Sequence, residues 1–94
     1  MGRKLPPMGK LAYRFLPCDD EGRPRENSRY TTVAGNGEVL GVGSVVEAAI
    51  FGYEEWEVVE VRQDRGSFVS AFDGDGAPLP FGGTLVCRGV RRHS

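Results

Sequence analysis

The chain has 94 residues, a formal net charge of −1, and hydrophobic and charged fractions of 39% and 27%. This length supports a single compact domain, and the composition argues against disorder along the whole chain. No apolar run approaches the ~20 residues that a membrane-spanning helix needs, and the basic start is not followed by the apolar segment of a secretory signal. We therefore expect a cytoplasmic protein.

The expected domain begins after a short lead-in. Residues 1–9 contain two adjacent prolines and two glycines, which is typical of a flexible segment, and we place the domain over residues 10–90. Over residues 11–16 the sequence LAYRFL alternates with a period of two, which predicts a half-buried strand that ends at the following proline. The polar run 18–27 contains glycine and proline and predicts a loop.

A second strand and a tight turn are expected next. β-branched and aromatic residues predict a strand over 29–33, with the sequence RYTTV. The Gly-Asn-Gly sequence at 35–37 permits positive φ and favours a turn. We expect this turn to fold residues 38–40 back against the second strand.

Residues 44–51 carry signals for two different structures. The segment Ser44–Glu47 fits a helix capping box, and Gly52 would suit the end of a short helix. A two-turn helix is marginal on its own, and this segment leads directly into an apolar strand pattern. We expect a strand over 44–51 and keep the short helix as the alternative.

The strand that follows, over residues 56–62, contains the only tryptophan of the chain. Trp56 and Val58 point to one face of this strand, whereas Val59 and Val61 point to the other. Both faces are therefore apolar, which predicts a central position in the fold.

The last third of the chain predicts two more strands. After a turn at 63–66, aromatic and small residues alternate over 68–72, and the Asp- and Gly-rich segment 73–78 predicts a loop. A closing strand is expected over 84–90. The remaining residues, 91–94, are expected to fray as a basic tail.

Five or six short strands at this spacing predict an all-β domain, a small barrel or two packed sheets. The order G-x-G-S-V-V, a short turn at Gly52-Tyr53, W-E-V-V-E-V-R, a hairpin with Phe68 and a closing T-L-V-C-R resembles the small SH3-like barrels of many bacterial proteins. The resemblance covers about residues 38–90. It implies a binding module more often than an enzyme, and it transfers no specific functional residue.

The two cysteines, Cys18 and Cys87, stand far apart, and neither belongs to a C-x-x-C motif. This excludes a zinc ribbon and a thioredoxin-type redox motif. We expect two separate thiols. A disulfide is the alternative, because both cysteines fall near the first and last strands, which often lie close together in small barrels.

The sequence offers no catalytic or cofactor-binding constellation. The single histidine, His93, is the next-to-last residue, where it cannot be held firmly as a catalytic base. The paired glutamates are expected to keep a strand edge soluble. The Asp-Gly-Asp-Gly segment at Asp73 lacks the glutamate of a calcium loop, because Thr84 stands at the twelfth position, and the glycines at 35–43 do not have phosphate-loop spacing. We expect no enzyme, no metal and no cofactor.

The charge is unevenly distributed along the chain. Residues 38–64 carry seven acids and one base, whereas both ends are basic. A nucleic-acid-binding alternative uses the terminal bases, which would converge if the terminal strands were neighbours, although the acidic centre argues against a broad basic face. These bases are Arg3, Lys4, Lys10, Arg91 and Arg92.

Protein or peptide binding is the leading functional expectation. An acidic and aromatic surface is predicted around Tyr53, Glu54, Glu55, Glu57 and Phe81, and it would suit a basic or proline-containing segment. The alternative is that the two aromatic residues cap the ends of the barrel. A third expectation is an assembly subunit that pairs with a second copy through an exposed strand edge over residues 29–33.

Overall fold

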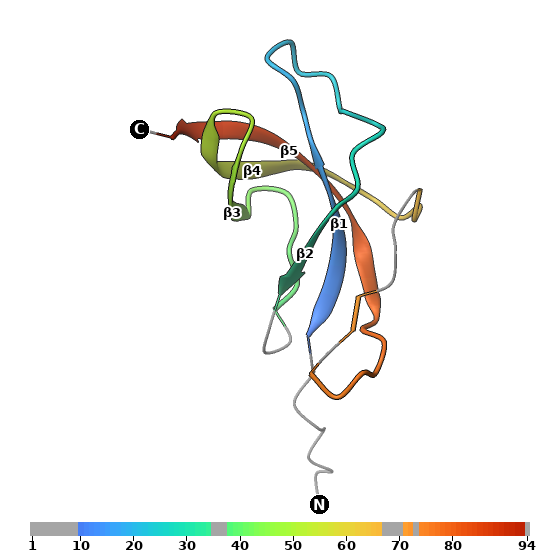
Figure 1. Cartoon of the computed structure of the whole chain (residues 1–94). Helices are drawn as coiled ribbons and strands as arrows, with labels where there is room; N and C mark the ends of the chain where they lie inside the picture. Colours follow the sequence, from blue (N-terminus) through green and yellow to red (C-terminus); the bar gives the residue numbers. More distant parts are fainter. Residues whose placement is uncertain (1–9, 35–37, 67–70, 73, 94) are drawn as a thin grey trace, which may run out of the picture.

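The computed structural model describes residues 10–34, 38–66, 71–72 and 74–93, and these residues fold into one strongly curled sheet (Figure 1). No helix occurs in these ranges, so the predicted all-β fold is confirmed. The strands are β1 (Leu11–Pro17), β2 (Tyr30–Ala34), β3 (Val45–Ile50), β4 (Tyr53–Arg62) and β5 (Phe81–Arg92).

The strands are arranged in the order β2-β1-β5-β4-β3. β5 pairs in parallel with β1, and all other neighbours are antiparallel. The first and last strands are therefore neighbours, which was the condition for both the disulfide and the nucleic-acid alternatives. β4 is an interior strand, as its apolar faces predicted, although the middle of the sheet is β5. The sheet is a half-barrel with two free edges, β2 and β3, and this shape is compatible with an SH3-like barrel.

The concave face of the sheet holds the main core. Trp56 is fully buried at its centre, and its ring makes edge-on contacts with Phe15 at 5.6 Å and Tyr53 at 5.4 Å between centroids. The indole Nε1 donates a hydrogen bond of 2.9 Å to the carbonyl oxygen of Ala48, so this buried donor is satisfied. The buried core around it comprises Tyr13, Phe15, Ala34, Val46, Val58, Leu85 and Cys87.

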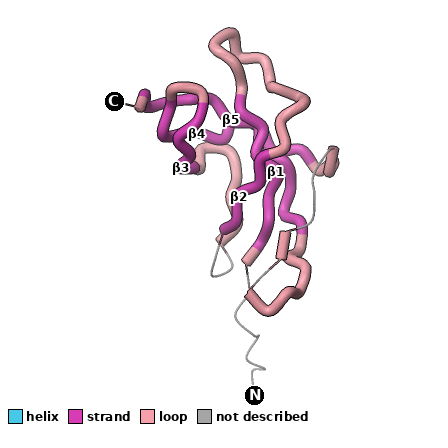
Figure 2. The backbone as a smooth tube through the Cα atoms, viewed as in Figure 1, coloured by secondary structure: helices cyan, strands magenta, loops and turns pink. Residues whose placement is uncertain are grey.

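The convex face of β1 is also buried, which differs from the predicted half-buried strand. Ala12, Arg14 and Leu16 are at most 4% exposed. The long loop between β1 and β2 returns across this face (Figure 2), and the amide of Arg25 donates to the carbonyl oxygen of Pro17 at 2.9 Å. The alternation of residues within β1 could not predict that this face is buried, because the residues that cover it belong to a loop.

The segment expected as strand or helix is strand β3. Phe51 and Gly52, with φ of 51° and 83°, form the two-residue turn to β4, and positive φ at both positions is the geometry of a type I′ hairpin. The Ser44 hydroxyl, the expected helix cap, instead accepts a hydrogen bond from the amide of Gly41 at 3.0 Å. The helical alternative was therefore wrong, because the turn is that of a β-hairpin and the residues before it pair with β4 as a strand.

Three strand boundaries need correction. Residues 38–40 form no strand, since the amide of Leu40 donates to the Tyr13 hydroxyl at 3.0 Å rather than to β2. Most of the expected strand 68–72 lies outside the described residues, and Phe72 makes only an isolated bridge to Pro78. β5 covers Phe81–Arg92 rather than the expected 84–90, and its last two residues, which were expected to fray, pair with β4.

Replacing Gly89 should destabilise the sheet. An alanine Cβ at this position would overlap the ring of Tyr53, which lies directly over the β5 backbone. We expect Gly89→Ala to lower the free energy of unfolding by about 1–3 kcal/mol, measured by urea denaturation followed by Trp56 fluorescence.

Gly74→Ala is the matched control, because a Cβ there meets no atom within 4 Å. Its unfolding free energy should stay within about 0.5 kcal/mol of the wild-type value. Equal stability of the two variants would show that the Tyr53 ring is not fixed against β5.

Candidate functional site

The predicted acidic and aromatic surface is only partly assembled. Tyr53, Glu54, Glu55 and Glu57 all belong to β4. Phe81 begins β5, and the antiparallel register places it at the opposite end of the β4–β5 ladder, because Tyr53 pairs with Arg92. One continuous surface therefore does not contain all five residues.

Tyr53 is held by contacts within the chain. Its ring lies over Gly89, contacts Trp56, and is covered by the Arg92 guanidinium at 4.7 Å from the ring centroid. Its hydroxyl donates to the carboxylate of Asp20 at 3.3 Å. These contacts match the alternative in which this tyrosine closes one end of the barrel.

The acids of β4 are paired with arginines of β5. Arg88 donates to Glu57 at 2.9 Å, and Arg91 contacts both Glu54 and Glu55. The hydrogen bond from Arg91 lowers the pKa of Glu55 below its ordinary value. The basic end of the chain thus compensates part of its acidic middle, an arrangement that the charge map alone did not reveal.

The described terminal bases of the nucleic-acid alternative, Lys10, Arg91 and Arg92, do not converge. β1 and β5 are neighbours, but they run parallel, so Lys10 at the start of β1 and Arg92 at the end of β5 lie at opposite ends of the sheet. Arg91 is engaged by glutamates. Arg3 and Lys4 lie outside the described residues.

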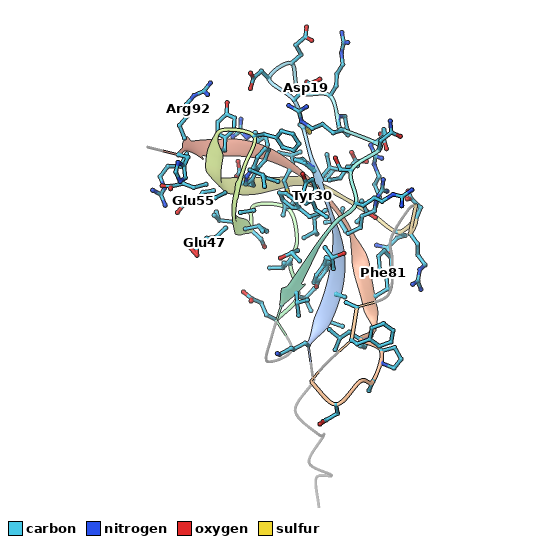
Figure 3. All side chains as sticks on the ribbon, in the orientation of Figure 1. Asp19, Tyr30, Glu47, Glu55, Phe81 and Arg92 are labelled. Atoms are coloured by element: carbon cyan, nitrogen blue, oxygen red, sulfur yellow. The ribbon has the colours of Figure 1, made fainter. Side chains whose placement is uncertain are left out.

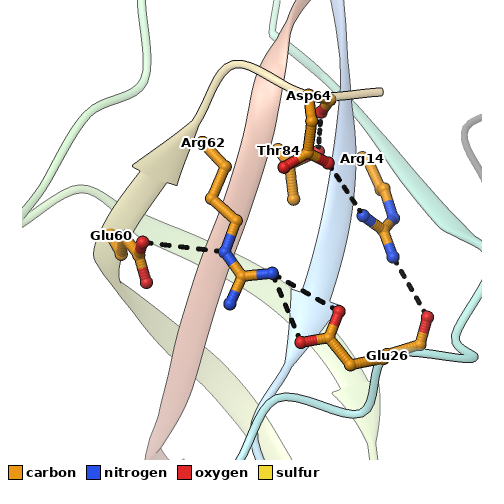
Figure 4. Close-up of polar contacts among 6 residues, drawn as sticks. All are labelled: Arg14, Glu26, Glu60, Arg62, Asp64 and Thr84. Atoms are coloured by element: carbon orange, nitrogen blue, oxygen red, sulfur yellow. Dashed lines mark hydrogen bonds and ion pairs between the residues drawn. The ribbon is translucent and has the colours of Figure 1, made fainter. Parts of the chain in front are cut away.

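A polar cluster on the convex face is the best-connected charged group among the described residues (Figure 4). The buried Arg14 donates to the carbonyl oxygen of Glu26 at 3.1 Å and lies 3.6 Å from the Asp64 carboxylate. Arg62 forms ion pairs with Glu26 at 3.3 Å and with Glu60 at 3.6 Å. The cluster fastens the β1–β2 loop and the segment after β4 to the sheet, which is a structural role that the sequence did not indicate.

The two cysteines are buried free thiols. Cys87 belongs to the concave core, whereas Cys18 packs with Leu16 and Val86 on the convex face. Burial raises the pKa of Cys87 to about 12 and also raises the pKa of Cys18. Their positions agree with two separate thiols, and the neutral form of each is favoured over the nucleophilic thiolate.

A groove between the free edges of the half-barrel is the strongest candidate site. Its volume is about 500 Å³. It is lined by Thr32, Val33 and Ala34 of β2, Glu38 and Leu40 of the connection, Val45, Val46 and Glu47 of β3, and Glu55 of β4.

The groove combines an apolar floor with acidic walls. Ala34 and Val46 are buried core residues, whereas Val33 and Val45 are 44% and 54% exposed. Glu47 lies directly opposite Glu55 in the β3–β4 register (Figure 3), and like charges at such positions repel. Among the described residues neither Glu47 nor Glu38 has an ion-pair partner. Of these groove residues, the predicted acidic and aromatic surface included only Glu55, and the predicted assembly edge included Thr32 and Val33.

The remaining candidate chemistries find no support in the described ranges. No group of three or more histidine, cysteine, aspartate or glutamate side chains there is arranged to hold a metal ion, and Asp73 lies outside them. The same part of the chain contains no helix that is long and apolar enough to cross a bilayer. No protein-family model matches the chain, and no curated protein or solved structure matches it significantly.

The Arg91–Glu55 pair predicts a specific loss of stability in acid. A lowered pKa means that the fold favours the Glu55 carboxylate, so its contribution is complete above the ordinary value of 4.5 and disappears as the pH falls through the lowered pKa. Glu55→Gln should therefore lose less stability than the wild type between about pH 5 and pH 3, measured as the urea midpoint.

Glu21→Gln is the control, because Glu21 is an exposed loop residue outside this pair. Its urea midpoint should fall with pH as steeply as that of the wild type. An unchanged slope in Glu55→Gln would mean that the pair does not contribute in solution.

Proposed function

We propose that this domain is a non-enzymatic protein-binding module that takes an extended, basic segment of a partner into the groove, where the segment adds as a strand to β3. The observation that carries the proposal is an acidic groove beside the unpaired edge of β3. Strand addition uses main-chain hydrogen bonds for affinity and side-chain pockets for selection.

The backbone of β3 supports strand addition. Within the described ranges β3 pairs with β4 on one side only, so its other edge has amide and carbonyl groups with no strand partner there. The connection between β2 and β3 does not pair with this edge as a strand, since residues 38–40 form no strand. The edge carries no lysine or proline, two residue types that commonly prevent pairing with another chain.

The charges of the groove support a basic occupant. Glu38 and Glu47 have no ion-pair partner among the described residues, and Glu47 faces a second carboxylate, Glu55. Glu55 is already held by Arg91, and a lysine or arginine of an added strand would lie beside Glu38 and Glu47 and form ion pairs with them. Apolar side chains on the other face of the same strand would lie beside Val46 and Leu40, which also line the groove.

The resemblance to SH3-like barrels also favours a binding module, and we infer that the domain belongs among such barrels. Its curled five-stranded sheet supports this inference. The parallel pairing involves β1, which lies outside the residues 38–90 that carry the resemblance. Assembly through the other free edge, β2, is the second candidate, because Tyr30 and Val33 of β2 are 40% and 44% exposed.

The proposal is tested with synthetic peptides. A short peptide of alternating valine and lysine should bind saturably and shift the backbone amide signals of Val45–Ile50 in NMR spectra. The double variant Glu38→Lys/Glu47→Lys should weaken binding about tenfold, because two ion pairs are lost and replaced by repulsion. Glu21→Lys, which reverses one charge outside the groove, should bind like the wild type.

A peptide of alternating proline and lysine is the control for the backbone. It carries the same charge but has no amide hydrogen at every second residue, so it should bind much more weakly. Equal binding of the two peptides would contradict strand addition. Equal affinity of the wild type and the double variant for the peptide would contradict binding in the groove. A mass that rises with protein concentration and amide shifts confined to β2 would favour the assembly alternative instead.

A further inference from the structure

A second concave site lies on the other side of the Tyr30–Phe51 contact. It is a pocket of about 530 Å³ between the β1–β2 loop and the turn that joins β3 to β4. Tyr30 and Phe51 meet edge-on with centroids 6.1 Å apart, and this contact joins the free edge of β2 to the hairpin. The pocket is lined by Arg25, Glu26, Asn27, Ser28, Arg29, Tyr30 and Phe51.

Arg25 is held in a fixed orientation beside this pocket. Its guanidinium carbon lies 4.0 Å from the centroid of the Phe51 ring, a cation–π contact that restricts the position of the group. Its Nε is buried and has no hydrogen-bond partner among the described residues. A buried donor without a partner is costly, so the contacts that the described chain gives to Arg25 are incomplete.

The charges of the pocket are not balanced within the described chain. Its only acid, Glu26, is engaged by Arg62 in an ion pair of 3.3 Å. Neither Arg25 nor Arg29 forms an ion pair with a described carboxylate. Two guanidinium groups therefore remain available, and their planar donors suit the oxygens of an anion with two negative charges.

We propose that this pocket binds a small organic phosphate monoester. The phosphoryl group would lie between Arg25 and Arg29, and the organic part would lie against the exposed side of Tyr30. A monoester carries a charge close to −2 at neutral pH, which matches the two arginines. The volume of about 530 Å³ is large for a bare oxyanion and falls within the range of small-molecule pockets.

Phenyl phosphate is the probe, and binding is followed through the NMR signals of the arginine Nε–H groups and of the Tyr30 ring. We expect saturable binding that shifts the signals of Arg25, Arg29 and Tyr30. Arg25→Gln and Arg29→Gln should each weaken binding about tenfold, because each removes a charge-assisted donor pair. Arg23→Gln, a charge removal on the same loop outside the pocket, should leave the affinity unchanged.

Two further ligands test separately the contributions of the phenyl ring and of the phosphoryl group to binding. Phenol, which lacks the phosphoryl group, should not bind, and inorganic phosphate should bind more weakly than phenyl phosphate. If inorganic phosphate bound as tightly as the ester, the proposal that the ligand has an organic part would be overturned. If phenol bound, the proposal of a phosphoryl site would be overturned. Arg29 is exposed, so Arg29→Gln should remain folded even if Arg25→Gln does not, and wild-type affinity in Arg29→Gln would also overturn the proposal.

Discussion

The pairing of β5 on both of its sides is the constraint on which this structure depends. β5 joins the β2–β1 pair to the β4–β3 hairpin. Two glycines of β5 allow aromatic rings to pack directly on its backbone. The Tyr13 ring lies over Gly82, and the Tyr53 ring lies over Gly89. Its arginines also hold the glutamates of β4. Core, shape and charge compensation therefore all depend on this one strand.

Much of the strand content could be predicted because it depends on local pattern. Alternation, β-branched residues and turn glycines placed β1, β2, β3 and β4 within a few residues of their bounds. The burial of Arg14 was not accessible in this way, since the groups that cover it come from distant loops. The prediction of a strand at 38–40 was wrong for a similar reason, because the amide of Leu40 donates its hydrogen bond to the distant Tyr13 hydroxyl.

The candidate site was harder to predict than the fold. Composition located the acids, but it could not tell which of them would be paired, and the partners of Glu54, Glu55 and Glu57 come from more than 30 residues away along the chain. The groove exists only because the curl of the sheet brings β2 near β3. Its unpaired acids, Glu38 and Glu47, lie in separate segments that no local motif connects.

The positions of the two cysteines have a consequence for the covalent chemistry of the domain. Their backbones are adjacent, with the amide of Cys18 donating to the carbonyl oxygen of Cys87 at 2.8 Å, yet their side chains lie on opposite faces of the sheet. Cross-linking them within one molecule would require the β1–β5 ladder to open. The fold thus disfavours a disulfide between Cys18 and Cys87 within one molecule, in oxidising as well as in reducing surroundings.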